Sequence, residues 1–299
     1  MIETINITKK FGGITAIKEL NITINESGVF GLVGTNGAGK STLLKLISGI
    51  LKPDDGKIMI DNESVFENPK IKSKFFYISD EQYFLKNASP EDMKIFYMRY
   101  FETFDSTYFN YAINLFGLDK NRKINTFSKG MKKQLSVILA LSSKTKYIFC
   151  DETFDGLDPV MRQTVKGLFC EELKNRGLTP IIASHNLREL EDICDHIGLL
   201  HKGGILFSRT LGDFRSGVNN VQVVVKPDFD INLINDLHIM GVKKSGSIYT
   251  LTIRASEEEI KEKIPKYEPI FFEIIPLTFE EIFITETEAK GYDIKKLIV

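Results

Sequence analysis

The stretch Gly34-Thr-Asn-Gly-Ala-Gly-Lys-Ser41 decides the fold of this chain. It fits the pattern G-x-x-x-x-G-K-S/T, in which glycines let the backbone N–H groups of a loop wrap around phosphates. The apolar segment 28–34 before it predicts a strand, and segment 40–51 after it has the apolar spacing of a helix. A helix N-terminus adds a positive dipole end to the loop. We therefore expect Lys40 to reach the outer phosphates and Ser41 to bind Mg²⁺.

Two adjacent carboxylates follow a second apolar segment. Tyr147-Ile-Phe-Cys150 predicts a short buried strand, and Asp151 and Glu152 come directly after it. In partnership with a phosphate loop, Asp151 would hold Mg²⁺ through water. Glu152 would accept a proton from the attacking water.

The order of expected strands and helices divides the chain into two domains. Strands and helices alternate over residues 1–215, which predicts an α/β domain whose parallel sheet is covered by helices. A helical subdomain at about 86–145 interrupts the alternation, and Ser89-Pro90-Glu91-Asp92 has the composition of a helix start. Residues 216–299 have the expected order βαββαβ, with the first helix at 231–240, and they predict a small α+β accessory domain of the ferredoxin-like type.

An aromatic stripe follows the helix start at Ser89. Its members recur at helical spacing, and they are Phe96, Tyr97, Tyr100, Phe101 and Phe104. One interpretation is core packing between helices. The other is a groove beside residues 79–84 that holds the helix of a partner protein. The candidate lining of that groove is Tyr83, Phe84, Phe96, Tyr97 and Tyr100.

Composition and charge exclude several classes of protein. The 299 residues are 42% hydrophobic and 26% charged, which is typical of a folded globular protein and not of a disordered chain. No apolar run approaches the roughly 18 residues that span a bilayer, and the N-terminus lacks a signal-peptide core, so we expect a cytosolic chain. The net charge of -1 gives no broad attraction to nucleic acid. Cys150, Cys170 and Cys194 form no C-x-x-C pair, so we expect neither a disulfide framework nor a zinc site.

Residues 1–215 resemble the ATP-binding subunit of ABC transporters, a P-loop NTPase. The phosphate loop and the Asp151-Glu152 pair stand in that family's order, together with four further features. These are Phe11 at the place of an adenine-stacking aromatic, Phe127–Gln134 like the signature motif, Phe154–Pro159 like the D-loop, and Ser184-His185 like the switch histidine.

The resemblance implies that this chain binds ATP and Mg²⁺ and hydrolyses ATP. The implied nucleotide contacts are Phe11, Gly34, Asn36, Gly37, Ala38, Gly39, Lys40, Ser41, Thr42, Ser128, Gly130 and Asp158. The implied metal contacts are Ser41, Asp151 and Asp80, and the implied catalytic residues are Glu152 and His185. Taken singly, Ser128 also fits a helix cap, Phe11 a core residue, and His185 a buried structural histidine.

The resemblance also implies partners. Two ATPase domains, either two copies of this chain or this chain and a paralogue, would close head to tail over two ATP molecules. The phosphate loop of one domain would then face Ser128 and Gly130 of the other. Integral-membrane transporter subunits would be the other partners, which places the chain peripherally on the inner face of the cell membrane. No nucleic acid is expected.

Two motifs depart from the family pattern. The signature has Ser-Lys-Gly-Met-Lys-Lys-Gln in place of the common Ser-Gly-Gly-Gln, although Ser128 and Gly130 remain. The family usually has a glutamine at the Q-loop, after an apolar strand, and here the strand 76–78 is followed by Ser79, Asp80, Glu81 and Gln82. Alignment by the strand puts Asp80 in that place, and Gln82 is the alternative. A carboxylate at this position is also able to reach Mg²⁺ through water.

A narrower resemblance points to ATPase subunits that export antibiotic and amphipathic peptides from Gram-positive bacteria. The segments that carry it are 79–84, 96–105, 130–134, 151–159, 184–198 and 276–293. The implied function is the motor of an exporter for peptides or lipophilic compounds. The alternative is a soluble ABC-type ATPase that acts on nucleic acid or the ribosome, but this chain has neither a second ATPase half nor a long coiled coil. A non-hydrolysing binding module is disfavoured by the intact Lys40, Asp151, Glu152 and His185.

Overall fold

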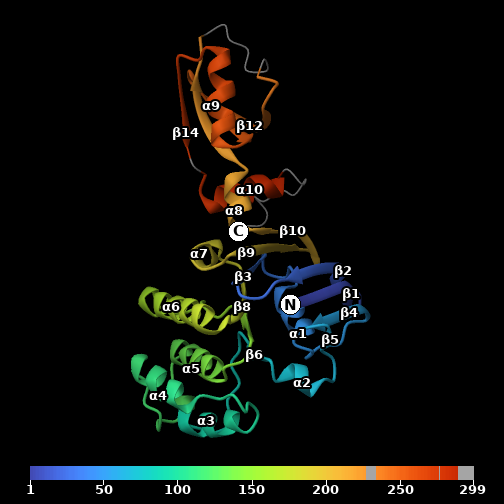
Figure 1. Ribbon diagram of the computed structural model, residues 1–299, viewed down its shortest axis with the longest axis vertical. Coiled ribbons are helices and arrows are strands. Elements are labelled where there is room, and N and C mark those ends of the chain that lie inside the picture. Colours follow the sequence, from blue (N-terminus) through green and yellow to red (C-terminus); the bar gives the residue numbers. More distant parts are fainter. Residues whose placement is uncertain (227–233, 276, 289–299) are drawn as a thin grey trace. The chain divides into compact units, whose positions relative to one another are not determined.

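The computed structural model describes residues 1–226, 234–275 and 277–288. The chain divides into two compact units, an N-terminal unit of residues 1–208 and a C-terminal unit of residues 209–299. Figure 1 shows the helices and strands of both units along the chain.

A six-stranded sheet forms the centre of the N-terminal unit. Its strand order is β10-β9-β3-β8-β7-β6, and the central pairs from β9 to β6 are parallel, as the alternation of strands and helices predicts. The strands are β3 (Phe30–Val33), β6 (Phe75–Ile78), β7 (Tyr147–Asp151), β8 (Thr179–Ser184), β9 (His196–His201) and β10 (Gly204–Thr210). Every residue of β3, β7 and β8 is buried, because these parallel strands have neighbours on both faces.

A second, antiparallel sheet of four strands was not predicted as a separate layer. Its order is β2-β1-β4-β5, built from β1 (Ile2–Phe11), β2 (Ile14–Ile24), β4 (Asp55–Ile60) and β5 (Glu63–Ser64). Buried and exposed residues alternate along β2, because one face of this sheet packs on the core and the other meets solvent. The tight β1–β2 turn passes through Gly12, whose φ of 56° suits glycine.

Helix α1 (Lys40–Ile47) lies between the two sheets, and it contacts β7 and β8 of one and β2 and β4 of the other. The helix ends at Ile47, earlier than the expected Leu51, because Ser48 caps it and Gly49 takes a left-handed φ of 62°. Residues of α1 and of both sheets share one hydrophobic core, which includes Ile7, Leu44, Ile60 and Phe149. This core fixes the start of α1 against the ends of the parallel strands.

The remaining helices of the unit flank the six-stranded sheet. They are α2 (Pro69–Lys72), α3 (Pro90–Met98), α4 (Ser106–Leu115), α5 (Lys129–Ser142), α6 (Pro159–Arg176) and α7 (Leu187–Glu191), with a short 3-10 helix at Ile124–Thr126. In Figure 1, α3, α4 and α5 lie away from the blue strands β1, β2 and β4. Ser89 and Asp92 form a complete capping box at the start of α3, as the sequence predicts.

The aromatic stripe is divided between a helix and a loop. Helix α3 ends at Met98, so Tyr100, Phe101 and Phe104 lie beyond it and the helical spacing overestimates the helix. Phe76 of β6 packs against Tyr97 and Phe101, with ring centroids 5.0 and 5.7 Å away. The stripe therefore joins the helical segment to the edge of the central sheet.

The C-terminal unit contains a four-stranded antiparallel sheet of order β12-β13-β11-β14. Its elements are α8 (Leu211–Ser216), β11 (Asn219–Val224), β12 (His238–Ser245), β13 (Ile248–Arg254), α9 (Glu257–Lys263), a 3-10 helix at Ile264–Tyr267, β14 (Phe271–Ile275) and α10 (Phe279–Glu288). This sheet is consistent with a ferredoxin-like arrangement. The helix expected at 231–240 is wrong for residues 234–240: 234–237 form no helix, and 238–240 begin β12, which pairs with β13. Residues 231–233 lie outside the described residues.

A charged cluster at Asp61 joins the two sheets of the N-terminal unit. The Asp61 carboxylate accepts hydrogen bonds from Lys74 Nζ at 2.8 Å, Tyr147 OH at 2.7 Å and Lys146 Nζ at 2.9 Å. Partial burial raises the pKa of this carboxyl, but the hydrogen bonds outweigh it and hold the pKa well below the ordinary 3.8. The carboxylate therefore stabilises the fold above pH 3.8, and this contribution is lost as the pH falls further.

We expect Asp61→Asn to lower the free energy of unfolding by about 2 kcal/mol at pH 7, because charge-assisted hydrogen bonds are lost. Below about pH 4, the difference in unfolding free energy between the variant and the unchanged chain should shrink, by up to about 1.4 kcal/mol per pH unit. Urea unfolding at pH 7, 5 and 3 measures it. Glu63→Gln, which breaks the exposed pair with Lys70, is the control and should change little. A difference that stays constant down to pH 3 would contradict the role of the charge.

Candidate nucleotide site

Four parallel strands end at one edge of the central sheet, and each delivers a candidate residue there. The register pairs Val33 with Ser184, Asp151 with Ala183, and Ile78 with Cys150. The phosphate loop follows β3, Glu152 follows β7, His185 follows β8, and the 79–84 loop follows β6. The carboxyl ends of parallel strands are where α/β proteins bind ligands.

The phosphate loop needs its glycines for two close approaches. A Cβ at Gly34 would lie 2.5 Å from Leu200 O, and a Cβ at Gly39 would lie 2.7 Å from Ala16 O. Gly39 also has a φ of 108°, which side chains rarely allow. Lys40 is almost fully buried, and its ammonium donates to Gly34 O at 2.6 Å and Thr35 O at 3.3 Å. The phosphate loop therefore surrounds the Lys40 ammonium with its own main-chain carbonyl groups at the start of α1.

Asp151 is buried beside the first turn of α1. Its carboxylate accepts a hydrogen bond from Ser41 Oγ at 2.9 Å and another from Tyr77 OH at 3.1 Å. Burial raises the pKa of Asp151, the two hydrogen bonds lower it, and the negative charge of Glu152 raises it again, for a net increase. Tyr77, on β6, is a site residue that the sequence did not indicate, because only the pairing of β6 with β7 brings it to Asp151.

Glu152 has an unusual backbone conformation, and its carboxylate contacts two other side chains. Its φ of 47° lies in the left-handed region, which is uncommon for a residue with a side chain. One carboxylate oxygen lies 3.3 Å from Lys40 Nζ, and the other lies 2.9 Å from Nδ1 of His185. Glu152 therefore links the phosphate loop to the histidine at the end of β8.

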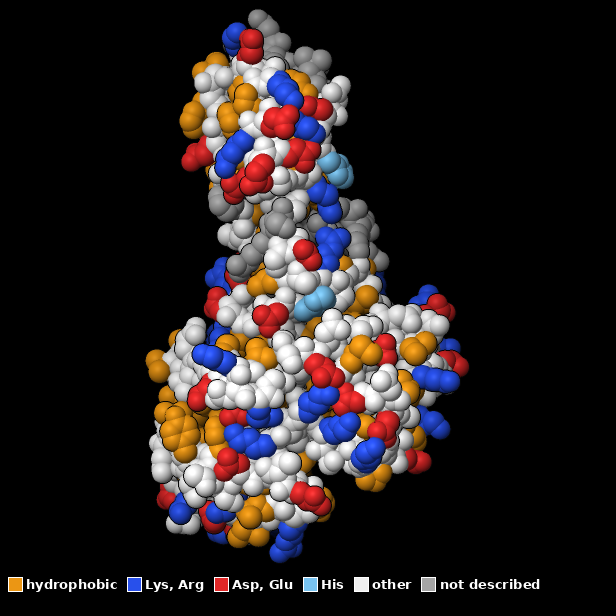
Figure 2. Space-filling view, viewed as in Figure 1, with side chains coloured by type: hydrophobic (Ala, Val, Ile, Leu, Met, Phe, Trp, Pro, Cys, Tyr) orange, Lys and Arg blue, Asp and Glu red, His pale blue; other side chains and the backbone are white. Residues whose placement is uncertain are grey.

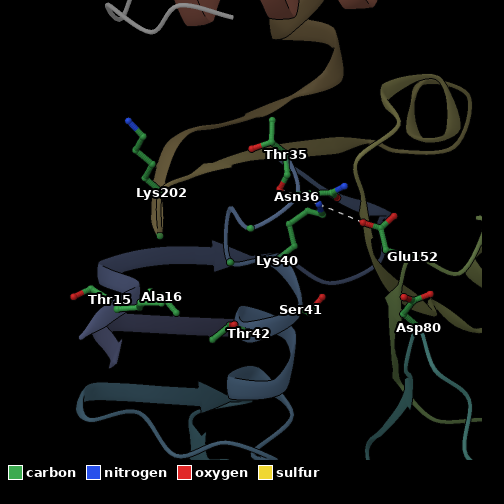
Figure 3. Close-up of a pocket in the computed structure, with 14 residues that line it drawn as sticks. Thr15, Ala16, Thr35, Asn36, Lys40, Ser41, Thr42, Asp80, Glu152 and Lys202 are labelled. Atoms are coloured by element: carbon green, nitrogen blue, oxygen red, sulfur yellow. Dashed lines mark hydrogen bonds and ion pairs between the residues drawn. The ribbon is translucent and has the colours of Figure 1, made fainter. Parts of the chain in front are cut away.

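A cavity of about 520 Å³ opens over these residues (Figure 3). Its lining comprises Ile14, Thr15, Ala16, Thr35, Asn36, Gly37, Gly39, Lys40, Ser41, Thr42, Asp80, Glu152, Lys202 and Gly203. In Figure 3, Thr15, Ala16 and Lys202 border one side, whereas Asp80 and Glu152 border the other. Nothing in the sequence indicated that residues of β2 and of the β9–β10 turn line the cavity, since neither segment carries a recognisable motif.

The donors at this cavity fit Mg²⁺ bound together with phosphates. The Ser41 hydroxyl and the carboxylates of Asp151 and Asp80 are hard oxygen ligands of the kind that Mg²⁺ prefers, with phosphate oxygens and water completing the shell. Across residues 1–226, 234–275 and 277–288, no three His, Cys, Asp or Glu side chains are grouped so that they could hold a metal ion by themselves. A metal at this site would therefore depend on the ligand's phosphates.

The two Q-loop candidates have different positions. Asp80 lines the cavity, whereas Gln82 turns back and donates through Nε2 to Ser79 O at 3.1 Å and Asp80 O at 2.7 Å. Gln82 instead borders a separate hollow of about 140 Å³, together with Tyr83 and Tyr97. Of the two candidates, only Asp80 lines the cavity of about 520 Å³.

Eight candidates are absent from the cavity lining. Gly34 and Ala38 belong to the phosphate loop beside it, Asp151 ends β7 and His185 follows β8, whereas Ser128, Gly130, Asp158 and Phe11 belong to other segments. Ser128 caps α5 by accepting from Met131 N at 3.2 Å, and Asp158 caps α6 by accepting from Met161 N at 3.0 Å. Gly130 lies beside Gly156, the oxygen of which is 3.3 Å from the place of a Cβ. Phe11 is 46% exposed at the end of β1, and Lys9 Nζ lies 5.6 Å from the centre of its ring. The signature and D-loop segments are thus adjacent to each other in the fold.

Comparison with known proteins gives consistent results. Residues 17–155 match the model of the ABC transporter family. The ABC transporter ATP-binding protein YtrB of Bacillus subtilis (strain 168) is 31% identical over 291 residues, which cover 97% of this chain and 99% of that protein. The bacitracin transport ATP-binding protein BcrA of Bacillus licheniformis is 30% identical over 209 residues, covering 69% of this chain and 68% of that protein. The solved dimer of the ATP-binding cassette MJ0796, in a post-hydrolysis state bound to ADP and Pi, shares the fold with a TM-score of 0.64 and 22% identity, covering 71% of this chain and 99% of that chain.

We expect Asp151→Asn to raise the melting temperature of the nucleotide-free chain at pH 7.5 by a few degrees, about 2–4 °C per kcal/mol. The reason is that the variant removes a buried charge beside Glu152. Since the folded-state pKa of Asp151 is raised, wild-type stability falls as the pH rises through that pKa, and the gain should be smaller at pH 5. Thermal unfolding at both pH values, with and without MgATP, measures it.

The same experiment separates stability from ligand binding. MgATP should stabilise the unchanged chain more than the Asp151→Asn chain, because the variant lacks the carboxylate at Ser41. If the nucleotide-free Asp151→Asn chain melted at a lower temperature than the unchanged chain at pH 7.5, the Asp151 charge would stabilise the fold and not destabilise it.

Proposed function

Because this chain belongs to the ABC transporter family, we propose that it is the motor subunit of an exporter whose membrane-spanning part is formed by other chains. The chain is an ATPase that uses ATP with Mg²⁺, as its family membership establishes. The observation that carries the proposed chemistry is Glu152, which stands between Lys40 and His185 at the edge of the cavity.

The phosphate loop binds and orients the nucleotide. Backbone N–H groups of Gly34, Asn36, Gly37, Ala38 and Gly39 face the phosphates, and the N-terminus of α1 adds its dipole. The Lys40 ammonium leaves its carbonyl partners for the outer phosphates, and Ser41 and Thr42 complete the contacts at the helix start. Phe11 stacks on the adenine ring.

Hydrolysis depends on how a water molecule is held against the γ-phosphorus. Glu152 accepts a proton from this water as its oxygen attacks and the bond to the bridging oxygen of ADP breaks. With Glu152 ionised, His185 donates its Nδ1–H to the carboxylate at 2.9 Å and so holds it in position. Ser41, Asp151 and Asp80 hold Mg²⁺, which would neutralise phosphate charge.

The signature residues act on a second ATPase domain. Ser128 and Gly130 bind the γ-phosphate held by the partner domain, and Asp158 contacts the nucleotide across the interface. None of the three lines this chain's own cavity, which is consistent with a role across the interface. ATP thereby joins two domains, either two copies of this chain or this chain and a paralogue, and hydrolysis releases them.

The hollow at the 79–84 loop is the docking place for a membrane subunit. Tyr83, Phe84 and Tyr97 line it, and Tyr83 is 80% exposed, whereas Phe96 and Tyr100 pack on one another outside it. A short apolar helix fits such an aromatic-lined hollow. In the described residues, no helix has the length and apolar character needed to cross a membrane. Membership of the ABC transporter family supports the proposal that the chain works at the inner face of the cell membrane.

The exported compound belongs to the class of peptides and lipophilic compounds. The match to a protein named for bacitracin transport supports this choice. Action on nucleic acid has less support, because Figure 2 shows basic and acidic side chains interspersed over the visible face of the N-terminal unit. A protein that tracks phosphate backbones concentrates basic residues on one face.

The roles of Glu152 and Lys40 are separable by mutation. Glu152→Gln should retain ATP binding, lower turnover by about 10²–10⁴-fold, and accumulate an ATP-bound dimer, because the general base is lost and the phosphate contacts remain. Lys40→Ala should lose ATP binding itself. ATPase assays, nucleotide titration and size-exclusion chromatography with ATP measure the three quantities. If the Glu152→Gln variant hydrolysed ATP at the rate of the unchanged chain, Glu152 would not be the general base.

The docking hollow is tested with Tyr83→Ala. The side chain is mostly exposed, so its loss should spare the melting temperature and ATP binding of the free subunit. Recruitment to membranes that contain the transporter subunits should weaken by roughly 2 kcal/mol, the effect of a buried interface aromatic. Tyr111→Ala, at a half-exposed tyrosine on α4, is the matched control. Equal recruitment of both variants would place the docking surface elsewhere.

A further inference from the structure

Lys133, on the signature helix α5, carries a positive charge that is completely buried. Its side chain is 0% exposed, although it lies in a helix whose neighbouring lysines reach solvent. The ammonium contacts two groups from different segments, Asp80 Oδ1 at 3.3 Å and the main-chain oxygen of Glu152 at 2.5 Å. A buried charge is stable in a protein only with such partners.

The contact with Glu152 concerns its backbone conformation. A φ of 47° is unfavourable for glutamate and persists only when the surroundings enforce it. The Glu152 N–H donates to Ala183 O at 3.0 Å, and the Glu152 carbonyl accepts from Lys133 and from Asp155 N at 3.3 Å. Lys133 is thus one of the groups that hold this residue in the conformation that aims its carboxylate at Lys40 and His185.

The contact with Asp80 concerns the 79–84 loop. Asp80 is the second residue of this loop after the carboxyl end of β6, it lines the cavity, and its side chain is half exposed. The Lys133 ammonium draws the carboxylate toward the inside of the unit. The same loop continues to Gln82 and Tyr83 at the 140 Å³ hollow.

We propose that Lys133 is a positioning residue for hydrolysis, which ties the 79–84 loop to the main chain of Glu152 through one buried ammonium. A shift of this loop at the hollow then alters the direction of the Glu152 carboxylate without any contact between the loop and that carboxylate. The inference rests on the proposed role of Glu152 as the base. Lys133 is fully buried and does not line the cavity, so it acts through Asp80 and Glu152 and not by contact with the phosphates.

The test compares two buried lysines. Lys133→Met removes both contacts while keeping a side chain of similar length. Lys166→Met is the matched control, since Lys166 is also buried and pairs at 3.3 Å with a largely exposed aspartate, Asp192, away from the cavity. Both variants are made in the full-length chain.

Two measurements distinguish positioning from general stability. We expect Lys133→Met to lower kcat for ATP at least about 10-fold with KM changed less than about 3-fold, because an arrangement needed only in the transition state is lost. In the nucleotide-free chain, hydrogen exchange should become faster in both 79–84 and 152–156. Lys166→Met should leave kcat and the protection of 79–84 unchanged. Segment 152–156 is not compared in this control, because Lys166 Nζ lies 5.9 Å from the centre of the Phe154 ring.

An Asp80→Asn variant tests the direction of the link. It should loosen 79–84 but leave 152–156 protected, because Lys133 keeps its bond to the Glu152 carbonyl. If Lys133→Met does not fold, Lys133→Gln replaces it. This variant retains an N–H donor but no charge, so 79–84 should loosen and kcat should fall.

Some outcomes would overturn the proposal. One is a folded Lys133 variant whose kcat stays within about two-fold of that of the unchanged chain. Another is a loss of kcat in Lys166→Met equal to that in Lys133→Met. The third is an unchanged hydrogen-exchange rate at 79–84 in the Lys133 variant. The exchange measurement involves no hydrolysis, so it remains valid if Glu152→Gln shows that the base is another group.

Discussion

The structure depends on one constraint, which is that four parallel strands end side by side at one edge of the sheet. Strands β3, β7 and β8 are buried along their whole length, and polar residues of the site stand at or directly after the carboxyl ends of the four strands. The pairs Val33–Ser184 and Asp151–Ala183 set the stagger, so the phosphate loop, Glu152 and His185 come within hydrogen-bonding range. A one-residue slip of β7 would turn Asp151 to the opposite face of the sheet and dismantle the site.

The site combines charges that oppose folding with contacts that hold them in place. Asp151 is buried next to Glu152, and its raised pKa reflects that arrangement. Glu152 adds a left-handed backbone, which is held by a strand carbonyl on one side and by the Lys133 ammonium on the other. Such groups are placed before the ligand arrives, so little reorganisation is needed during the reaction.

Local sequence patterns were enough to predict most of the fold and part of the candidate site. The glycine loop, the apolar strands and the capping box at Ser89 are short-range patterns, and the parallel sheet they predicted is confirmed. The helix end at Met98 and the strand at 238–240 were missed, because tertiary packing and strand pairing overrode helical spacing there. Tyr77 and Lys202 belong to no motif, and Lys133 lies in the signature-like segment, whose pattern does not indicate where its ammonium goes. Their places at the site come from contacts between segments far apart in the chain, which no local pattern contains.

The Lys40–Glu152 pair has a consequence for ligand discrimination. In the nucleotide-free chain, the tethered carboxylate occupies the lysine at 3.3 Å and acts as an intramolecular competitor for anions. A tethered group has a high effective concentration, so a weakly held monoanion does not displace it. A polyphosphate does, because it gains the loop N–H groups and the helix dipole at the same time as the lysine. That exchange frees the carboxylate from the lysine and leaves it with its contact to His185. A free carboxylate at this position is therefore conditional on a ligand with several phosphates.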